Sequence, residues 1–129
     1  MVYISQLTNI YGDYLANTGR SDEDYKRVSD LMAMLLEKYA NITGSIEPDK
    51  THINLISKAA YFFDIGRMAI PDELIKNHKF AGSNMQLYET HTQVGAHIIQ
   101  LNKAHACRYF VKVCSDICIH HHERFDGLG

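Results

Sequence analysis

Apolar residues recur three and four positions apart along most of this chain, which is the spacing of amphipathic α-helices. The clearest segment begins at a capping-box-like start in residues 21–24 and carries its apolar stripe through residues 25–39. A helix over about residues 4–15 precedes it and ends at Asn17 and Gly19. No segment with the two-residue period of a β-strand is long enough to predict one. The sequence therefore predicts an all-α fold.

The rest of the chain supplies the other helices. Residues 53–63 are almost wholly apolar and predict a buried helix, and Pro71, followed by two acidic residues, begins a short one. A second capping box opens a predicted helix over residues 83–101, after a loop at residues 77–82. The last helix is expected from about residue 104 to 121. Together these segments predict a bundle of about five to six helices.

Length and charge restrict the class of protein. We expect a single domain over residues 1–129, with a net charge of −2 that gives no reason to bind a nucleic-acid polymer or an anionic membrane. Cys107, Cys114 and Cys118 are spaced as one helix stripe, so they do not predict a disulfide framework. Since we find neither a signal peptide nor the roughly 18 apolar residues of a membrane span, a cytoplasmic location is expected.

Two residues that we expect to be buried are candidates for chemistry. Asp64 directly follows the apolar helix, where its charge would be costly unless a cation or several hydrogen-bond donors met it. It could equally cap the turn around Gly66. His91 shares a helix face with Leu87 and Val94, so we expect it to point inward, either as a core histidine or as a metal ligand.

Three consecutive histidines at residues 120–122 carry a stronger signal. Neighbouring residues on a helix point about 100° apart, so at a frayed helix end the last two imidazoles could reach two adjacent metal ions while His120 faces elsewhere. A second interpretation joins Cys114 and Cys118 to these two histidines in a zinc site, because all four lie along one helix face. A single straight helix rarely surrounds one tetrahedral ion, and no CxxC pair is present.

Three motifs together resemble a known family. They are Phe63-Asp64-Ile65-Gly66-Arg67 with the residues that follow to Leu74, His91 with Gly95, and His121-His122-Glu123-Arg124-Phe125-Asp126-Gly127-Leu128-Gly129. In order and spacing they resemble the HD-GYP family, a branch of the HD-domain metal-dependent phosphohydrolases whose members cleave the bacterial messenger cyclic di-GMP. The resemblance covers residues 20–129, leaves residues 1–19 as an N-terminal helix, and implies an HD-domain-like helical bundle.

The resemblance implies a role for each matching residue. Asp64, His91, His121 and His122 would hold divalent metal ions, with iron or manganese expected. Asp64 and Arg67 would be catalytic, and Arg67, Arg124 and Asp126 would bind substrate. The implied reaction is in-line attack of hydroxide on a phosphodiester, with the hydroxide activated by metal.

The chain also departs from the family pattern. Phe63 stands where the family has the first histidine of its His-Asp pair, and Asp24, ahead of Arg27 and Val28, stands where it has a further ligand histidine. The family continues beyond the position of Gly129 into helices that supply another aspartate ligand. Since the loss of metal ligands lowers metal affinity, we expect impaired or lost catalysis.

Two functions therefore remain open. One is a metal-dependent phosphohydrolase domain related to cyclic di-GMP phosphodiesterases, with a cyclic dinucleotide as ligand. The other is a non-catalytic regulatory or protein-interaction module that keeps the HD fold. A homo-oligomer or a signalling-protein partner fits the second function, because a helical domain without closing helices would expose an apolar flank.

Overall fold

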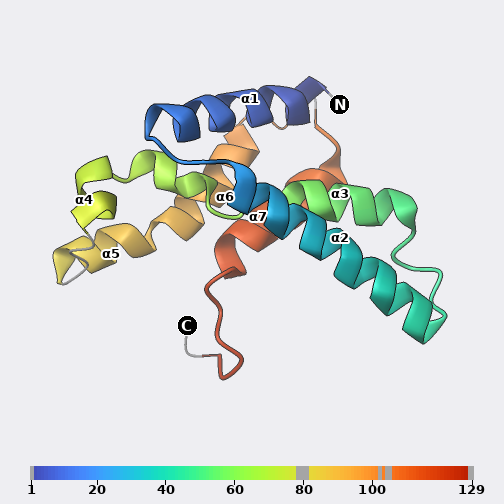
Figure 1. Ribbon diagram of the computed structural model, residues 1–129. Helices are drawn as coiled ribbons and strands as arrows, with labels where there is room; N and C mark the ends of the chain where they lie inside the picture. Colours follow the sequence, from blue (N-terminus) through green and yellow to red (C-terminus); the bar gives the residue numbers. More distant parts are fainter. Residues whose placement is uncertain (1, 78–81, 102, 104–105, 128–129) are drawn as a thin grey trace.

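Helices form the regular secondary structure of the computed structural model, which describes residues 2–77, 82–101, 103 and 106–127 (Figure 1). These residues form seven α-helices and one 3₁₀ helix, with no strand among them, so the predicted all-α bundle is confirmed. The elements are α1 (Val2–Asn17), α2 (Glu23–Thr43), α3 (Lys50–Ala60), η1 (Ile65–Ala69), α4 (Asp72–Asn77), α5 (Ser83–Glu89), α6 (His91–Leu101) and α7 (Arg108–His120).

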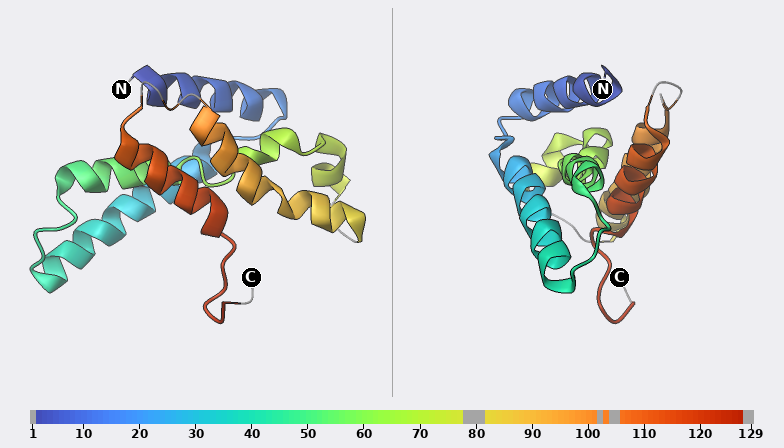
Figure 2. Two further views of the ribbon diagram at one scale, coloured as in Figure 1. Left: turned by 180° about the vertical axis from the view of Figure 1, so that it is seen from behind. Right: turned by 90° about the vertical axis from the view of Figure 1, so that its right-hand side faces the viewer.

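The core forms where α1 lies across the other helices (Figure 2). Helices α6 and α7 pack on each other, α3 packs against both α2 and α7, and η1 packs on α6. Aromatic rings fill much of the space between them, with the Tyr11 ring lying edge-on to Tyr25 and Tyr61. The largest fully buried side chains are those of Tyr11, Phe62, Phe110, Leu15, Ile65, Ile99, His91, Cys114 and Cys118.

Helix α2 differs from the prediction in what covers it. It begins and ends near the expected positions, but Tyr25 is its one buried residue. Leu31 and Leu35, in the apolar stripe that was expected to face the core, are 54% and 58% exposed. Only the start of α2 meets the aromatic core. Further along the stripe Met32 and Leu36 are half-buried, since α3 packs against α2. Leu31, Leu35 and Tyr39 stay exposed.

Two predicted helices are shorter or divided. Helix α3 ends at Ala60, three residues before the predicted end, and residues 61–64 turn into η1. The helix predicted over residues 83–101 is broken at Thr90, whose hydroxyl donates to the carbonyl of Leu87, so that His91 becomes the first residue of α6. Cys107 is exposed rather than inward, while Cys114 and Cys118 are buried as expected.

Three predicted features fall wholly or partly outside the described residues. These are most of the loop at residues 77–82, the predicted start of the last helix at residue 104, and the final Leu128-Gly129. None of the described helices is both long and apolar enough to cross a membrane.

A close backbone contact joins η1 to α6. A Cβ atom on Gly66 would lie 1.8 Å from the carbonyl oxygen of His91 and 2.6 Å from the amide nitrogen of Gly95. A Cβ on Gly95 would in turn lie 3.2 Å from the amide nitrogen of Gly66 and 3.3 Å from the Cβ of Cys118. Only glycine at position 66 allows the two backbones to approach this closely.

Replacing Gly66 with alanine should destabilise the fold. The added methyl group must push η1 away from α6, so we expect the free energy of unfolding in urea to fall by about 1–3 kcal/mol. Gly12→Ala is the matched control, because a Cβ there meets no atom within 4 Å and Gly12 lies inside α1. That substitution should be neutral or stabilising by up to about 1 kcal/mol. Equal stability of the two variants would contradict the tight contact.

Candidate metal centre

Asp64 lies in the turn between α3 and η1, two residues after the buried Phe62 and directly before the buried Ile65. The residue is only 4% exposed. Its Oδ2 lies 2.8 Å from Nε of Arg67, one turn further on. Its Oδ1 is buried and has no hydrogen-bond partner among the described residues. One oxygen of a buried carboxylate is therefore left for a ligand that the described side chains do not supply.

His91 and His121 meet next to this oxygen. Their Nε2 atoms are 3.2 Å apart, and they lie 3.3 Å and 3.7 Å respectively from Oδ1 of Asp64. His91 is 1% exposed and begins α6, while His121 follows the last residue of α7. Three potential ligand atoms from three separate elements thus converge on one point.

Backbone carbonyls fix the orientation of both rings. Nδ1 of His91 hydrogen-bonds to the carbonyl of Tyr88, and Nδ1 of His121 lies 2.9 Å from the carbonyl of Cys118. Since a carbonyl only accepts, we assign the Nδ1–H tautomer to both rings, which leaves each Nε2 as a lone pair. Two facing lone pairs cannot hydrogen-bond to each other, but both can bind a cation. Metal-binding histidines use this arrangement, with the second ring nitrogen held by a carbonyl or carboxylate.

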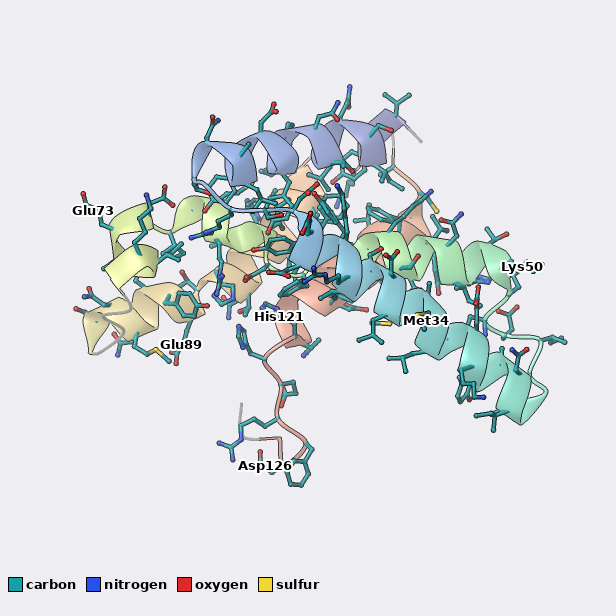
Figure 3. All side chains as sticks on the ribbon, in the orientation of Figure 1. Met34, Lys50, Glu73, Glu89, His121 and Asp126 are labelled. Carbon is teal, nitrogen blue, oxygen red and sulfur yellow. The ribbon has the colours of Figure 1, made fainter. Side chains whose placement is uncertain are left out.

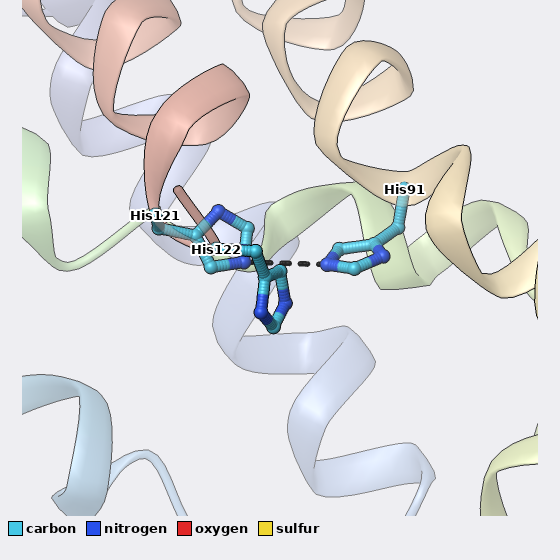
Figure 4. A group of neighbouring side chains, drawn as sticks. All are labelled: His91, His121 and His122. Atoms are coloured by element: carbon cyan, nitrogen blue, oxygen red, sulfur yellow. Dashed lines mark hydrogen bonds between the residues drawn. The ribbon is translucent and has the colours of Figure 1, made fainter. Parts of the chain in front are cut away.

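His122 completes a group of three imidazoles (Figure 4). Ligand nitrogens of His91, His121 and His122 all lie within 4.8 Å of one another. The His122 ring centroid is 5.1 Å from that of His91 and 4.2 Å from that of His121. His122 is exposed, so it closes the group on the solvent side.

Desolvation favours the neutral form of His91 and His122. Burial lowers the pKa of His91 below its usual value, and this outweighs the opposite effects of the Tyr88 carbonyl and Asp64. Partial desolvation, together with His121, also lowers the pKa of His122. Neutral imidazole is the form that binds metal ions, so the site is prepared to take up a cation near neutral pH. The unbonded Asp64 oxygen and the facing nitrogens fit a divalent metal.

Arg67 contacts Asp64 from the side away from the histidines. Its guanidinium donates to the hydroxyl of Tyr88 and lies 5.3 Å from the centre of that ring. The carbonyl of Arg67 also accepts a hydrogen bond from the hydroxyl of Tyr14, at 3.1 Å. Burial opposes the charge of Arg67, but Asp64 and Tyr88 outweigh it, so the pKa is raised and the side chain stays cationic.

Tyr88 was not predicted as part of the site. Its carbonyl orients His91, its hydroxyl accepts from Arg67, and its ring centroid lies 4.7 Å from that of His91. The capping pattern of residues 83–86 predicted one continuous helix. The break near Tyr88, which brings this residue to the site, was therefore not expected.

Arg124 and Asp126 are not brought to the cluster. They pair with each other at 2.6 Å on the exposed segment that leads away from the helices (Figure 3). Their predicted substrate-binding role remains a prediction. Asp24 lines a pocket together with His122, but its exposed carboxylate pairs with Arg27 at 3.1 Å.

The zinc interpretation is not supported by the arrangement of the thiols. Cys114 and Cys118 direct their Sγ atoms toward the carbonyls of Ala59 and Phe62, at 3.6 Å and 3.4 Å, inside the core. Hydrogen bonding to Cys118 and burial raise the pKa of the Cys114 thiol far above its usual range. A thiol that stays protonated is a poor zinc ligand.

Phe63 occupies the edge of the site. Its ring lies 5.3 Å from that of His121 and 5.4 Å from that of Tyr25, so it packs beside the cluster without offering a donor. A pocket of about 470 Å³ opens here, lined in part by Arg20, Asp24, Phe63, Asp64, Arg67 and His122. Two of the candidate metal residues, Asp64 and His122, therefore face a cavity large enough for a small ligand.

A comparison with known protein families identifies the family of the chain. The sequence model described as "HD domain" matches residues 9–129. The chain belongs to the HD-domain family. This confirms the resemblance to HD-domain phosphohydrolases, and use of a divalent metal is implied for the family.

The curated relatives of this HD domain are named as phosphodiesterases that act on cyclic dinucleotides. A cyclic di-GMP phosphodiesterase of Vibrio cholerae is 30% identical over 112 residues, covering 85% of this chain and 22% of that protein. One of Pseudomonas aeruginosa is 38% identical over 72 residues, covering 55% and 16%. A 3'3'-cGAMP-specific phosphodiesterase of Vibrio cholerae is 28% identical over 99 residues, covering 76% and 18%. The chain spans less than a quarter of each relative's length. No solved structure matches it.

Replacing His121 and His122 with alanine should remove bound metal. We expect wild-type protein incubated with Mn²⁺ or Fe²⁺ and then desalted to retain metal by elemental analysis, and the double variant to retain at most about a tenth as much, because two proposed ligands are lost. His120→Ala is the matched control, since this neighbouring imidazole is 62% exposed and is not in the group. Full metal occupancy in the double variant would place the site elsewhere.

Proposed function

We propose that this HD domain binds a divalent metal and, through it, the phosphodiester of a cyclic dinucleotide, with impaired hydrolysis. One observation carries the proposal. The Nε2 atoms of His91 and His121 face each other beside an Asp64 oxygen that is buried without a hydrogen-bond partner. In a protein interior such a cluster is costly unless a cation joins its members.

Asp64, His91, His121 and His122 are the proposed ligands. Nitrogen and carboxylate donors of this kind suit iron or manganese. When bound, the metal supplies Lewis acidity to water and to a phosphodiester oxygen. The protein's contribution is orientation, because the carbonyls of Tyr88 and Cys118 hold two imidazoles in the ligand tautomer.

Arg67 has a positioning role in this proposal. Its ion pair with Asp64 holds one carboxylate oxygen, so the other oxygen faces the histidines. The guanidinium also brings positive charge to the pocket, which favours an anionic ligand. Its hydrogen bond to Tyr88 joins the same residue that orients His91.

Impaired hydrolysis follows from Phe63. A phenyl ring lies beside His121, where it fills space without binding a cation. The site keeps the geometry of its other members but has one imidazole fewer than the HD-GYP pattern. We therefore expect low metal affinity and, because of it, low turnover.

Restoring histidine at position 63 should raise metal content and activity. The Phe63→His variant adds a donor next to His121, and we expect several-fold more retained Mn²⁺ or Fe²⁺ together with faster conversion of cyclic di-GMP to linear product, followed by chromatography. Phe125→His is the matched control, because Phe125 is fully exposed on the C-terminal segment. Unchanged metal content in Phe63→His would contradict the assignment of this position to the site.

A second function is favoured by an apolar groove next to the same site. The groove has a volume of about 630 Å³, and its apolar lining includes Val28, Met32, Ile56, Ala60, Phe63 and Ile117. The uncovered stripe of α2 continues from it, with Leu35 and Tyr39 exposed. Such a surface suits an interaction module that pairs with a second copy or another protein.

Self-association provides the test of this second function. If the groove joins two copies, size-exclusion chromatography with light scattering should show a dimer whose fraction rises with protein concentration. Met32→Glu, which places a charge in the groove, should make the protein monomeric, whereas Met34→Glu, at a 66% exposed position of α2 outside the groove lining, should change it less. A monomeric wild-type protein at all concentrations would exclude the homo-oligomer.

A further inference from the structure

We propose that Arg20, in the connection between α1 and α2, binds the anionic phosphate group of the ligand at the metal centre. This inference rests on the proposed function and extends it by one residue. Arg20 is half-buried and lines the same pocket as Asp64, Arg67 and His122. Arg20 precedes the three motifs that begin at Phe63, His91 and His121, so none of them indicated it.

A network of hydrogen bonds connects Arg20 to the site. Its Nη1 donates to the hydroxyl of Tyr14 at 3.4 Å, and this hydroxyl donates to the carbonyl of Arg67 at 3.1 Å. The guanidinium carbon also lies 6.0 Å from the centre of the Tyr14 ring. Tyr14 thus ties the cation to the 3₁₀ helix that follows Asp64.

Arg20 keeps most of its hydrogen-bonding capacity. A guanidinium has five N–H donors, and the bond to Tyr14 is the one hydrogen bond that Arg20 makes with the described residues. No carboxylate among those residues forms an ion pair with it. Asp24, which lines the same pocket, is engaged with Arg27.

Arg67 is differently placed, although it was the residue expected to bind phosphate. Its guanidinium is held by Asp64 on one side and by the hydroxyl of Tyr88 on the other. A ligand anion would have to compete with the Asp64 carboxylate for it. Arg20 has no such competitor among the described residues, so it is the cation in this pocket that is better able to accept a new anion.

The class of ligand follows from this chemistry. A guanidinium offers paired donors that match two oxygens of a phosphate, and it keeps its charge at every physiological pH. The pocket of about 470 Å³ leaves room for a phosphodiester beside Arg20, Asp64 and His122, which all line it. With the proposed metal bound, a phosphodiester anion in this pocket would have a cation on each side, the metal and Arg20.

The test uses the 129-residue chain loaded with Mn²⁺ and titrated with cyclic di-GMP in a calorimeter. Arg20→Gln should weaken binding by about 10- to 100-fold, because a charge-assisted hydrogen bond is lost. Arg20→Lys, which keeps the charge without the paired donors, should restore part of the affinity. Arg108→Gln is the matched control, since this exposed arginine lines a different pocket, and it should bind like wild type.

Two further measurements separate anion binding from a structural effect. Arg20→Gln should retain wild-type metal content and a wild-type melting temperature, and its affinity should depend less on salt concentration. If wild type binds metal and cyclic di-GMP but Arg20→Gln binds as tightly, the role of Arg20 is refuted and the proposed function stands. If Arg20→Gln loses metal or stability, Arg20 is structural and the inference fails. Wild-type protein that holds metal without binding the nucleotide would overturn both the Arg20 inference and the proposed ligand.

Discussion

The contact between the backbones of η1 and α6 at Gly66 and Gly95 is the constraint on which the site depends. Gly66 lies two residues after Asp64, and the carbonyl that it approaches belongs to His91. The contact therefore fixes the carboxylate and the first imidazole relative to each other. Gly95 also meets Cys118, whose carbonyl orients His121, so a single region of tight packing sets all three members.

Burial gives this geometry its chemical consequence. Asp64 is almost fully enclosed, and Arg67 compensates its charge from one side only. On the other side stand His91 and His121, and desolvation favours the neutral form of His91. A neutral donor lone pair does not compensate a carboxylate, and a proton shared between the rings would be opposed by the same burial that lowers the His91 pKa. A divalent cation would compensate the Asp64 charge and would also bind the imidazole lone pairs. The cluster is therefore better explained as a metal centre than as a hydrogen-bonded core.

Periodicity located the helices, and the apolar run before Asp64 correctly indicated a buried carboxylate. Periodicity could not show that the α2 stripe around Leu35 is exposed, because the pattern reports which face of a helix is apolar and not what packs on it. Tyr88 escaped prediction because part of its contribution comes from a backbone carbonyl, which any residue has. Arg124 and Asp126 were assigned from the family resemblance alone, and their role stays a prediction. Their segment extends away from the helices, where the two pair with each other.

Phe63 packs against the proposed metal centre without offering a ligand. Its ring lies edge-on to His121 and close to Tyr25, so it supports the position of an imidazole that it cannot assist chemically. A small residue there would leave a gap beside His121, since the surrounding rings are packed in place. In the proposed site Phe63 would therefore lower metal affinity while it preserves the orientation of the remaining donors. A centre altered in this way is suited to weak or regulated occupancy, with its geometry set by packing before any cation enters.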